Sequence, residues 1–432
     1  MRFLFSDDVR RDPYPWYAEL RRASPVLRDP RTGTWMVFDY HGVRRALDDH
    51  DAFGSDVSAA GYGNLGWFIF FDPPRHTKMR ALISRAFTPR TVAGLEPRVR
   101  EIARGLLDTT AGRDAFDVVG DFAVPLPLMV IAELLGAPAD DWSRFRRWSD
   151  VILELALTLQ GGAEAQHAVA AFTAVRAEMA RYLAELLDVR RDAPRDDLLS
   201  RLLAAEVDGS RLSDGEILAF FQLLLLAGHE TTTNLIGNAV ISFAEHPEQL
   251  ARLRADPTLL PSAVEEVLRY RSPVQAVFRV TRRDVTLGGH AIPARSLVLA
   301  MIGSANRDPS RFPAPDAFDV ARAPNAHVAF GHGIHFCLGA PLSRLEARVA
   351  LGELLARTET IALADDQPWE PRAAFHVHGA TRLPIHVTPR SASATTQGSA
   401  NTNTVGDPTC SLTNRPDGRP EATATYCLPS TA

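Results

Sequence analysis

The segment that most constrains this chain is FGHGIHFCLG, residues 330–339 of 432. It surrounds Cys337, the only cysteine before residue 391, with three glycines and two histidines. Glycine lets the backbone approach a flat or bulky partner without a side-chain clash. Leucine and valine then recur at the spacing of an amphipathic helix, at positions 338, 342, 345 and 349. Because a helix N-terminus favours a thiolate, the segment predicts a nucleophile or a metal ligand.

Four interpretations of this cysteine are open on the segment alone. It can be a small buried hydrophobic residue, as free cysteine often is. It can bind zinc, although no standard finger has the spacing of its candidate partners His327, His332 and His335. It can be a catalytic nucleophile, but nothing else in the chain points to acyl transfer. It can be the axial thiolate ligand of haem iron.

The composition excludes several other classes of protein. A net charge of −5 and a pI near 6.2 give no general attraction to nucleic acid. A single cysteine over residues 1–390 forms no internal disulfide there, which indicates a reducing compartment. The N-terminus is not a secretory signal, and the longest apolar stretch, residues 217–228, is shorter than the roughly 20 residues of a membrane span. We therefore expect a soluble cytoplasmic protein without a membrane anchor.

The chain divides into two parts by composition. Residues 1–390 are expected to form one mostly helical domain, with helical spacing over 98–107, 128–135 and 169–187. Short strands are expected at 34–38, 285–287, 297–301 and 385–387. Residues 391–432 are rich in Ser, Thr, Asn, Gly and Pro. They lack the apolar surface needed to offset their conformational entropy, so a disordered tail is expected.

A second segment places polar side chains inside an apolar helix. Residues 220–240, FFQLLLLAGHETTTNLIGNAV, carry in their middle Gly228, His229, Glu230, Thr231 and Thr232. Burying an acid and hydroxyls costs free energy unless they have partners. The alternative is a helix whose polar face is turned to solvent. A zinc-protease helix would need a second histidine at position 233, where this chain has threonine.

The cysteine segment resembles the haem-binding signature of the cytochrome P-450 superfamily, Phe-x-x-Gly-x-(His/Arg)-x-Cys-x-Gly. Every fixed position is filled, by Phe330, Gly333, His335, Cys337 and Gly339. The resemblance is closest to soluble bacterial members. It implies a mainly α fold with small β-sheets, with haem b (iron protoporphyrin IX) between a long distal helix and a proximal helix preceded by the cysteine loop. On that resemblance Cys337 is the proximal ligand of the iron.

The apolar helix matches the superfamily's distal motif, Ala/Gly-Gly-x-(Asp/Glu)-Thr, at Ala227, Gly228, Glu230 and Thr231. The resemblance implies that Gly228 leaves room for oxygen against the backbone. The Thr231 hydroxyl is expected to bond to the carbonyl of Ala227, four residues earlier, and to open the helix there. Glu230 and Thr231 would then relay protons through water to dioxygen.

Glu266 and Arg269 stand three residues apart, on one helix face. By themselves they fit a solvated surface pair equally well. The superfamily uses this Glu-x-x-Arg motif as a buried ion pair behind the cysteine loop, closed by a third residue. Arg322 stands at the position of that third partner, and the expected role is in folding and haem retention.

Four cations match the positions that hold the haem propionates in the superfamily. His76 and Arg80 lie four apart in a segment that resembles the helix Asp-Pro-Pro-x-His-x-x-x-Arg, and Arg279 and His335 complete the set. Buried carboxylates need charged or N–H partners. Each of these residues taken singly fits an ordinary surface cation.

The resemblance implies a monooxygenase of secondary metabolism that inserts one atom of O2 into a lipophilic small molecule. Such enzymes receive electrons from an NAD(P)H-dependent reductase through a ferredoxin or flavodoxin. Five cations and no acid lie between residues 73 and 95, and either form a docking patch for that donor or a solvated helix face. We expect a monomer that binds no nucleic acid. The rival functions are a peroxygenase using hydrogen peroxide, which would carry Arg-Pro in place of Glu230-Thr231, and a haem-binding protein without turnover.

The resemblance implies a reaction type and leaves the identity of the substrate open. Macrolides and other polyketides, terpenoids, steroids, fatty acids and drug-like molecules fit equally. The pocket walls implied by the resemblance come from the loop before residue 72, residues 152–160, the distal helix, and the segments near 274 and 377. A mostly apolar pocket is expected, lined by Trp67, Phe68, Phe70, Val274, Val277 and Val377.

Overall fold

The computed structural model describes residues 6–60, 66–157, 163–364 and 367–390. The chain up to Arg390 forms one compact unit. The tail expected over residues 391–432 lies outside the described residues, as do residues 61–65 and 158–160 of the expected pocket walls. The expectation of a disordered tail therefore stays a prediction.

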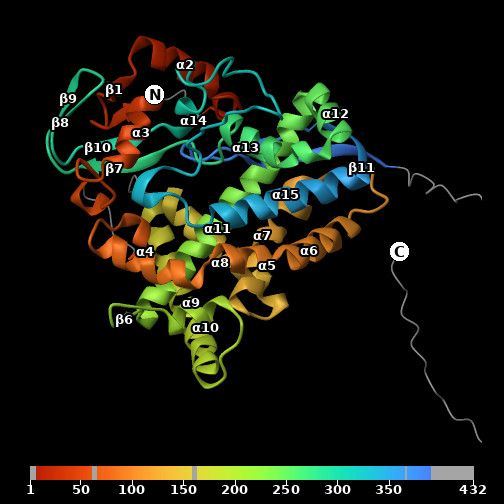
Figure 1. Ribbon diagram of the computed structural model, residues 1–432, viewed down its shortest axis with the longest axis horizontal. Coiled ribbons are helices and arrows are strands. Elements are labelled where there is room, and N and C mark those ends of the chain that lie inside the picture. The colour runs from red at the N-terminus through yellow and green to blue at the C-terminus, as the bar shows by residue number, and fades with distance from the viewer. Residues whose placement is uncertain (1–5, 61–65, 158–162, 365–366, 391–432) are drawn as a thin grey trace, which may run out of the picture. The chain divides into compact units, whose positions relative to one another are not determined.

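Helices dominate the described residues (Figure 1). In chain order they are α1 (Asp7–Arg11), α2 (Tyr14–Ala23), α3 (Tyr40–Asp48), α4 (Arg75–Ala86), α5 (Pro89–Gly94), α6 (Glu96–Asp108), α7 (Pro125–Leu135), α8 (Trp142–Leu157), α9 (Ala163–Asp192), α10 (Leu198–Ala204), α11 (Asp214–Glu245), α12 (Pro247–Ala255), α13 (Leu260–Tyr270), α14 (Ile302–Ala305) and α15 (Ala340–Arg357). The helices predicted at 98–107, 128–135, 169–187 and 220–240 are confirmed within α6, α7, α9 and α11.

The strands are short and form small sheets. They are β1 (Val26–Arg28), β2 (Trp35–Val37), β3 (Phe53–Gly54), β4 (Ala115–Asp117), β5 (Glu206–Val207), β6 (Ser210–Arg211), β7 (Val277–Thr281), β8 (Val285–Leu287), β9 (His290–Ile292), β10 (Leu297–Ala300), β11 (Thr358–Leu363), β12 (Glu370–Pro371), β13 (Ala380–Arg382) and β14 (Pro384–Pro389). The predicted strands are confirmed as β2, β8, β10 and part of β14.

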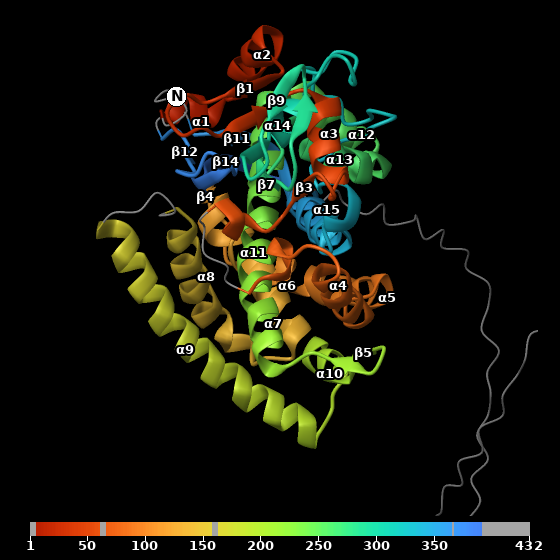
Figure 2. The ribbon, with the colours of Figure 1, turned by 90° about the vertical axis from the view of Figure 1, so that its left-hand side faces the viewer.

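The largest sheet has the strand order β1-β2-β10-β7-β3. β2 and β10 are parallel, with Met36 opposite Leu299, and the other neighbours are antiparallel. This sheet lies at one end of the molecule, with α2, α3 and α14, and α9 and α10 lie at the other end (Figures 1 and 2). A second sheet, β11-β14-β4, and three two-stranded pairs complete the β structure.

The long helix α11 organises the helical part, and Figure 2 shows it running through the centre of the molecule. It begins at a capping box, in which the Glu216 N–H donates to the Ser213 hydroxyl and the Glu216 carboxylate accepts from the Ser213 N–H. Its 32 residues span about 48 Å. Most of its side chains between residues 217 and 243 are buried, so α11 is a core helix, but Ala227 is exposed and Gly228 and Thr231 are half-buried, so one turn in its middle is open.

One stretch, residues 118–135, is long and apolar enough to cross a membrane by length and composition. It comprises the π-helical turn η4 (Val118–Ala123) and α7. Of this stretch 78% is buried inside the fold, and Leu126 and Leu128 are fully enclosed. Such burial is typical of a core helix, and α7 packs against α11 and α6.

An ion network in α13 joins the helical part to the loops before α15. Glu266 and Arg269 are both 0% exposed, and their side chains pair at 2.7 and 2.8 Å. Arg322 Nε lies 3.0 Å from the same carboxylate. Arg269 also donates to three carbonyls, those of Asn306, Pro315 and Ala317. The structure thus brings together the three residues that the sequence proposed for an ion network.

We predict that Glu266→Gln lowers the free energy of unfolding by about 3–5 kcal/mol, because it leaves the Arg269 guanidinium buried without a counter-charge. Denaturant unfolding of the purified protein measures this change. The matched control is Arg252→Ala, which breaks the exposed pair with Asp319 (2.9 Å) and should cost less than about 1 kcal/mol. Equal losses of unfolding free energy in the two variants would show that the buried pair stabilises the fold no more than the exposed pair does.

Candidate functional site

The cysteine loop is held by backbone contacts and by two glycines in left-handed conformation. Gly331 and Gly333 have φ values of 74° and 70°. A side chain at Gly333 would place its Cβ 3.0 Å from the Leu47 carbonyl oxygen of α3, so only glycine fits there without displacement. The Cys337 N–H donates to the Phe330 carbonyl at 2.9 Å. The loop ends where α15 begins at Ala340, as the helical spacing after Cys337 predicted.

The surroundings of the thiol act on its charge in opposite directions. Burial raises the pKa of Cys337, while the backbone N–H groups of Gly339 and Ala340 and the positive charges of Arg80 and Arg344 lower it. A metal ion that coordinates a thiol removes the proton outright. The same N–H groups and cations would then stabilise the bound thiolate.

A neighbouring network argues against zinc as the partner of Cys337. His327 Nε2 lies 3.1 Å from the Glu265 carboxylate, which also accepts two bonds from Arg344 at 2.7 and 2.8 Å. Arg344 stacks over the Phe330 ring, 4.5 Å from its centre. In the described part of the chain, no group of three or more His, Cys, Asp or Glu side chains could hold a metal ion. A lone protein thiolate suits a metal whose other ligands come from a porphyrin.

The four residues predicted to bind the haem propionates lie in or next to the cysteine loop. Several of their polar atoms have no hydrogen-bond partner. His76 of α4 is 1% exposed, and the centre of its ring lies 4.0 Å from that of His335. Neither nitrogen of His76 nor Nε2 of His335 has a hydrogen-bond partner among the described residues. Arg279 of β7 donates to the carbonyl of Phe278, and Arg80 to that of Phe336 at 2.6 Å.

The lowered pKa values in this cluster indicate that it lacks an anionic partner. Burial, and then the charge of Arg80, lower the pKa of His76 to about 4. Burial, and then His76, lower the pKa of His335 to about 3. Burial also lowers the pKa of Arg279 to about 10. Buried groups that repel one another and keep unpaired donors would be stabilised by an anion. The cluster therefore fits the carboxylates of a haem next to a thiolate for its iron.

The predicted distal residues lie on α11. The Thr231 hydroxyl donates to the Ala227 carbonyl at 2.7 Å, the bond expected from the sequence. The expected opening of the helix is wrong, since α11 is continuous from Asp214 to Glu245. A carbonyl oxygen has two lone pairs, so it can accept from the hydroxyl without losing its helical bond. Thr232 Oγ1 lies 3.3 Å from Ser343 Oγ and so links α11 to α15.

Gly228 has a packing role in the structure. A Cβ at this position would lie 3.3 Å from the Ile131 side chain, so the glycine allows α7 to approach α11 closely. The expectation that Gly228 also makes room for oxygen stays a prediction.

Glu230 has a partner that the sequence did not reveal. Its buried carboxylate lies 3.7 Å from Arg372 Nη1, which follows β12. Burial raises the pKa of Glu230, and the charge of Arg372 lowers it. Arg372 belongs to no motif and is far from Glu230 in sequence, so only the folded chain places the two together.

The predicted pocket residues come from segments that meet near α11. Trp67 Nε1 donates to Gln222 of α11 at 3.3 Å, and Phe68 stacks on His76 with ring centres 6.2 Å apart. Val274 and Val377 form an isolated β-bridge. Phe70, Val274 and Val277 are half-buried and pack against the core. The aromatic residues thus belong to the helical core and the two valines to the core beside the largest sheet, and the expectation that they share one apolar pocket wall stays a prediction.

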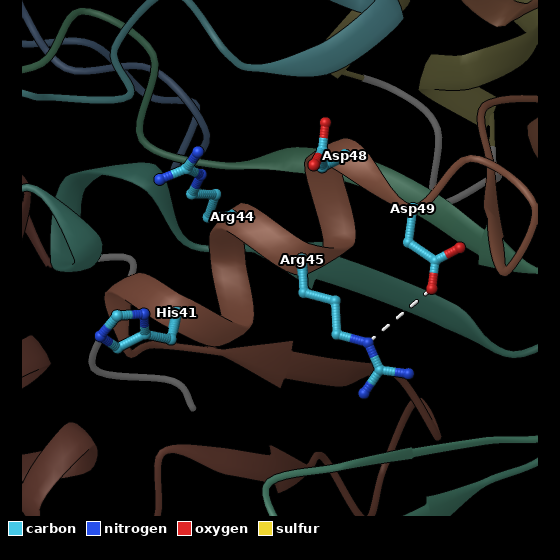
Figure 3. A pocket seen from close by; sticks show the side chains of 5 residues that line it. All are labelled: His41, Arg44, Arg45, Asp48 and Asp49. Atoms are coloured by element: carbon cyan, nitrogen blue, oxygen red, sulfur yellow. Dashed lines mark ion pairs between the residues drawn. The ribbon is translucent and has the colours of Figure 1, made fainter.

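A separate groove of about 370 Å³ lies on the surface of α3. Figure 3 shows its lining side chains, His41, Arg44, Arg45, Asp48 and Asp49. Arg45 Nε lies 3.8 Å from Asp49 Oδ2, and Asp48 Oδ1 lies 3.2 Å from Nδ1 of His332 in the cysteine loop. A groove with charged walls does not suit a lipophilic molecule, and the expectation of a substrate pocket at the aromatic segment stays a prediction.

Comparisons with known proteins agree with this geometry. Residues 151–378 match the family model for cytochrome P450. The chain is 42% identical over 404 residues to the vitamin D(3) 25-hydroxylase of Pseudonocardia autotrophica, covering 90% of this chain and 97% of that protein. The structure of cytochrome P450 CYP109Q5 from Chondromyces apiculatus is similar, with a TM-score of 0.82, 45% identity and coverage of 90% and 98% of the two chains.

A further similar structure is CYP109E1 from Bacillus megaterium in complex with corticosterone, with a TM-score of 0.81 and 39% identity. It covers 88% of this chain and 99% of that chain. Identity of this extent over most of both chains decides the family as well as the fold. The chain belongs to the cytochrome P450 family, and it is a monooxygenase with the mainly helical fold of that family.

Proposed function

We propose that the Cys337 thiolate ligates the iron of haem b and that His76, Arg80, Arg279 and His335 hold its propionates. The family implies a haem cofactor. The observation that carries the assignment is the cluster of buried, unpartnered imidazole nitrogens beside the cysteine loop. Within the described ranges of the chain, no carboxylate pairs with either histidine at salt-bridge distance, so the imidazole nitrogens remain available for an anion.

When bound, the haem supplies activation of O2 and insertion of one oxygen atom into the substrate. The chain's own groups set the conditions for that chemistry. Cys337 would hold the iron and donate electron density to it, and the N–H groups of Gly339 and Ala340 would moderate the charge on sulfur. Because burial raises the pKa of Glu230, its carboxyl takes up and releases a proton closer to neutral pH. Thr231 passes protons onward from a hydroxyl fixed against the Ala227 carbonyl.

We infer that electrons arrive from a separate donor, a ferredoxin or flavodoxin reduced by an NAD(P)H-dependent reductase. Phe336, next to Cys337 in the chain, is 40% exposed. Helices α4 and α5 carry four exposed cations: Arg75, Lys78, Arg85 and Arg90. A positive surface at the cysteine side suits an acidic donor. The expected monomeric state and cytoplasmic location belong to this proposal.

We infer further that the substrate is a lipophilic molecule of steroid size. The expected wall is aromatic and aliphatic, and two similar proteins are a vitamin D(3) 25-hydroxylase and an enzyme crystallised with corticosterone. Apolar walls bind such molecules mainly by removing their surface from water. A carrier without turnover would have no use for the acid and hydroxyl pair of α11, and a peroxygenase would replace that pair.

Cys337→Ala is predicted to abolish the thiolate-type Soret band of the dithionite-reduced, carbon monoxide-bound protein, because it removes the axial ligand. The matched control is Cys410→Ala, which removes a cysteine of the C-terminal segment and should leave the band unchanged. An unchanged spectrum in Cys337→Ala would refute the ligand assignment.

Thr231→Ala is predicted to lower the amount of product formed per NAD(P)H by about tenfold or more and to raise the release of hydrogen peroxide. The reason is that proton delivery becomes too slow to compete with the loss of reduced oxygen as peroxide. Oxygen and peroxide electrodes with a supplied ferredoxin and reductase measure both quantities. Thr173→Ala is the control, since that hydroxyl makes the same bond to the carbonyl four residues earlier (2.8 Å) on an outer helix. Full coupling in Thr231→Ala would remove the hydroxyl from the proposed relay.

Phe70→Ala is predicted to weaken steroid binding roughly tenfold, because part of an apolar wall is lost. Titration of the haem spectrum with corticosterone and related compounds gives the dissociation constants. Ile69, its exposed neighbour, provides the control Ile69→Ala. An equal loss of steroid affinity in both variants, or no loss in either, would show that Phe70 does not line the substrate pocket.

A further inference from the structure

A buried glutamine of α11 carries a hydrogen-bond donor that no described residue uses. Gln222 is 1% exposed and lies on α11 before the Glu230–Thr231 pair. Its Oε1 accepts from Trp67 Nε1 at 3.3 Å. Because the indole nitrogen can only donate, this bond decides which end of the amide faces Trp67 and leaves the NH2 group directed elsewhere. Within the described ranges, Nε2 has no hydrogen-bond partner.

An unused donor at such a position costs free energy. A buried amide loses its bonds to water, and the loss is recovered only if a protein or ligand acceptor replaces them. Leucine, the residue that follows in this stretch of α11, would fill the same space without that cost. A glutamine here is therefore explained by an acceptor that reaches the amide and does not belong to the described chain.

The helix face that carries Gln222 borders open space. Half-buried Ala219 and Leu226 lie one turn to either side of Gln222 on α11, in a helix that is otherwise mostly buried. Leu226 is followed by exposed Ala227 and, one turn later, by half-buried Thr231. An accessible strip thus runs along the helix from the glutamine to the turn where the oxygen chemistry is proposed.

The aromatic segment 66–70 lies alongside this strip. Trp67 stacks on half-buried Phe70, with ring centres 6.1 Å apart and planes at 17°. Phe68 contacts Phe220 of α11, with ring centres 6.3 Å apart. A Cβ at Gly66 would meet the side chain of α11 residue 219 at 3.9 Å, so the backbone of the segment runs close to the helix. The NH2 group is therefore a single free donor between apolar surfaces.

These surroundings define the group that fits the amide. The neighbours of Gln222 named above are apolar and offer no countercharge, so a carboxylate beside it would be buried unpaired. A ketone or hydroxyl oxygen accepts from the NH2 group without that cost. From Gln222 to Thr231 the helix rises about 13 Å. A rigid molecule of steroid size has a comparable length, so one end can bind the amide while the other lies near Thr231.

We propose that Gln222 is a specificity-determining residue whose NH2 group donates to a neutral oxygen at the end of the substrate remote from the oxidised carbon. This role rests on the proposed function and narrows its substrate class. The substrates are rigid lipophilic molecules with a ketone or hydroxyl at one end, and fatty acids fall outside the class. A site that hydrogen-bonds a substrate oxygen discriminates against an analogue that lacks it, because the protein's donor is then left unpaired.

The binding test uses androstanedione, with a ketone at each end, and androstane, with none. Equilibrium dialysis of the holoenzyme gives both dissociation constants without turnover or a haem spectrum. Gln222→Met keeps the size and shape of the side chain and removes the donor. The dissociation constant for androstanedione, divided by that for androstane, should rise about tenfold in this variant. General damage to the fold would weaken both compounds and leave the ratio unchanged.

The matched control is Gln249→Met. Gln249 of α12 is half-buried, and its Oε1 accepts from the Val320 N–H at 3.2 Å, away from the aromatic segment. Its ratio should equal that of the wild type. An unchanged ratio in Gln222→Met, an equal change in Gln249→Met, or no binding of androstanedione to the wild type overturns the proposal.

The turnover test uses androstanone with a single ketone on ring A, together with a ferredoxin and a reductase. The wild type should oxidise the ring D end, because the ketone is held at Gln222, and Gln222→Met should oxidise both ends. Oxidation of the ring A end by the wild type overturns the proposed orientation. If the wild type forms no product from any lipophilic compound, the proposed function fails instead, and the ratio from dialysis still decides whether Gln222 binds the ketone.

Discussion

Buried positive charge needs a negative partner, and this constraint separates two regions of the protein. Arg269 of α13 meets it internally, through Glu266 and three backbone carbonyls. The cluster beside the cysteine loop does not, because buried Arg279 has no salt-bridge partner among the described residues, and the neutral rings of His76 and His335 keep unpaired nitrogens. A fold that pairs one buried guanidinium and leaves another without a carboxylate, beside unpaired imidazole nitrogens, is arranged for an external anion. The haem carboxylates are that anion in our account, and the thiol lies beside them.

The polar side chains in the middle of helix α11 lie in an apolar core, and each of them has a different hydrogen-bond or ion-pair partner. Thr231 bonds back to the helix itself, while Glu230 reaches Arg372 and His229 reaches Ser149. Gly228 lets α7 pack against the same turn. One helical turn thus supplies a hydroxyl, an acid and a neutral imidazole without breaking the helix. This arrangement explains why polar residues persist in a segment that is otherwise suited to a hydrophobic core.

The sequence predicted the features that depend on local pattern. The cysteine loop and the helix after it follow from glycine positions and from the spacing of leucines. The three-residue interval between Glu266 and Arg269 allows them to pair, but the burial of that pair followed only from the family resemblance. Features that depend on distant segments were not predictable. The pairing of β2 with β10 and the ion pair of Glu230 with Arg372 each join residues far apart in the chain. The expected break in α11 was wrong because a carbonyl can accept two bonds.

The central claim is a bond between the Cys337 sulfur and porphyrin-held iron. X-ray absorption at the iron edge, with metal analysis of the purified protein, tests it most directly. The account predicts one iron per chain with a single sulfur neighbour in addition to the porphyrin nitrogens. Iron surrounded only by nitrogen and oxygen, or zinc in its place, would contradict it.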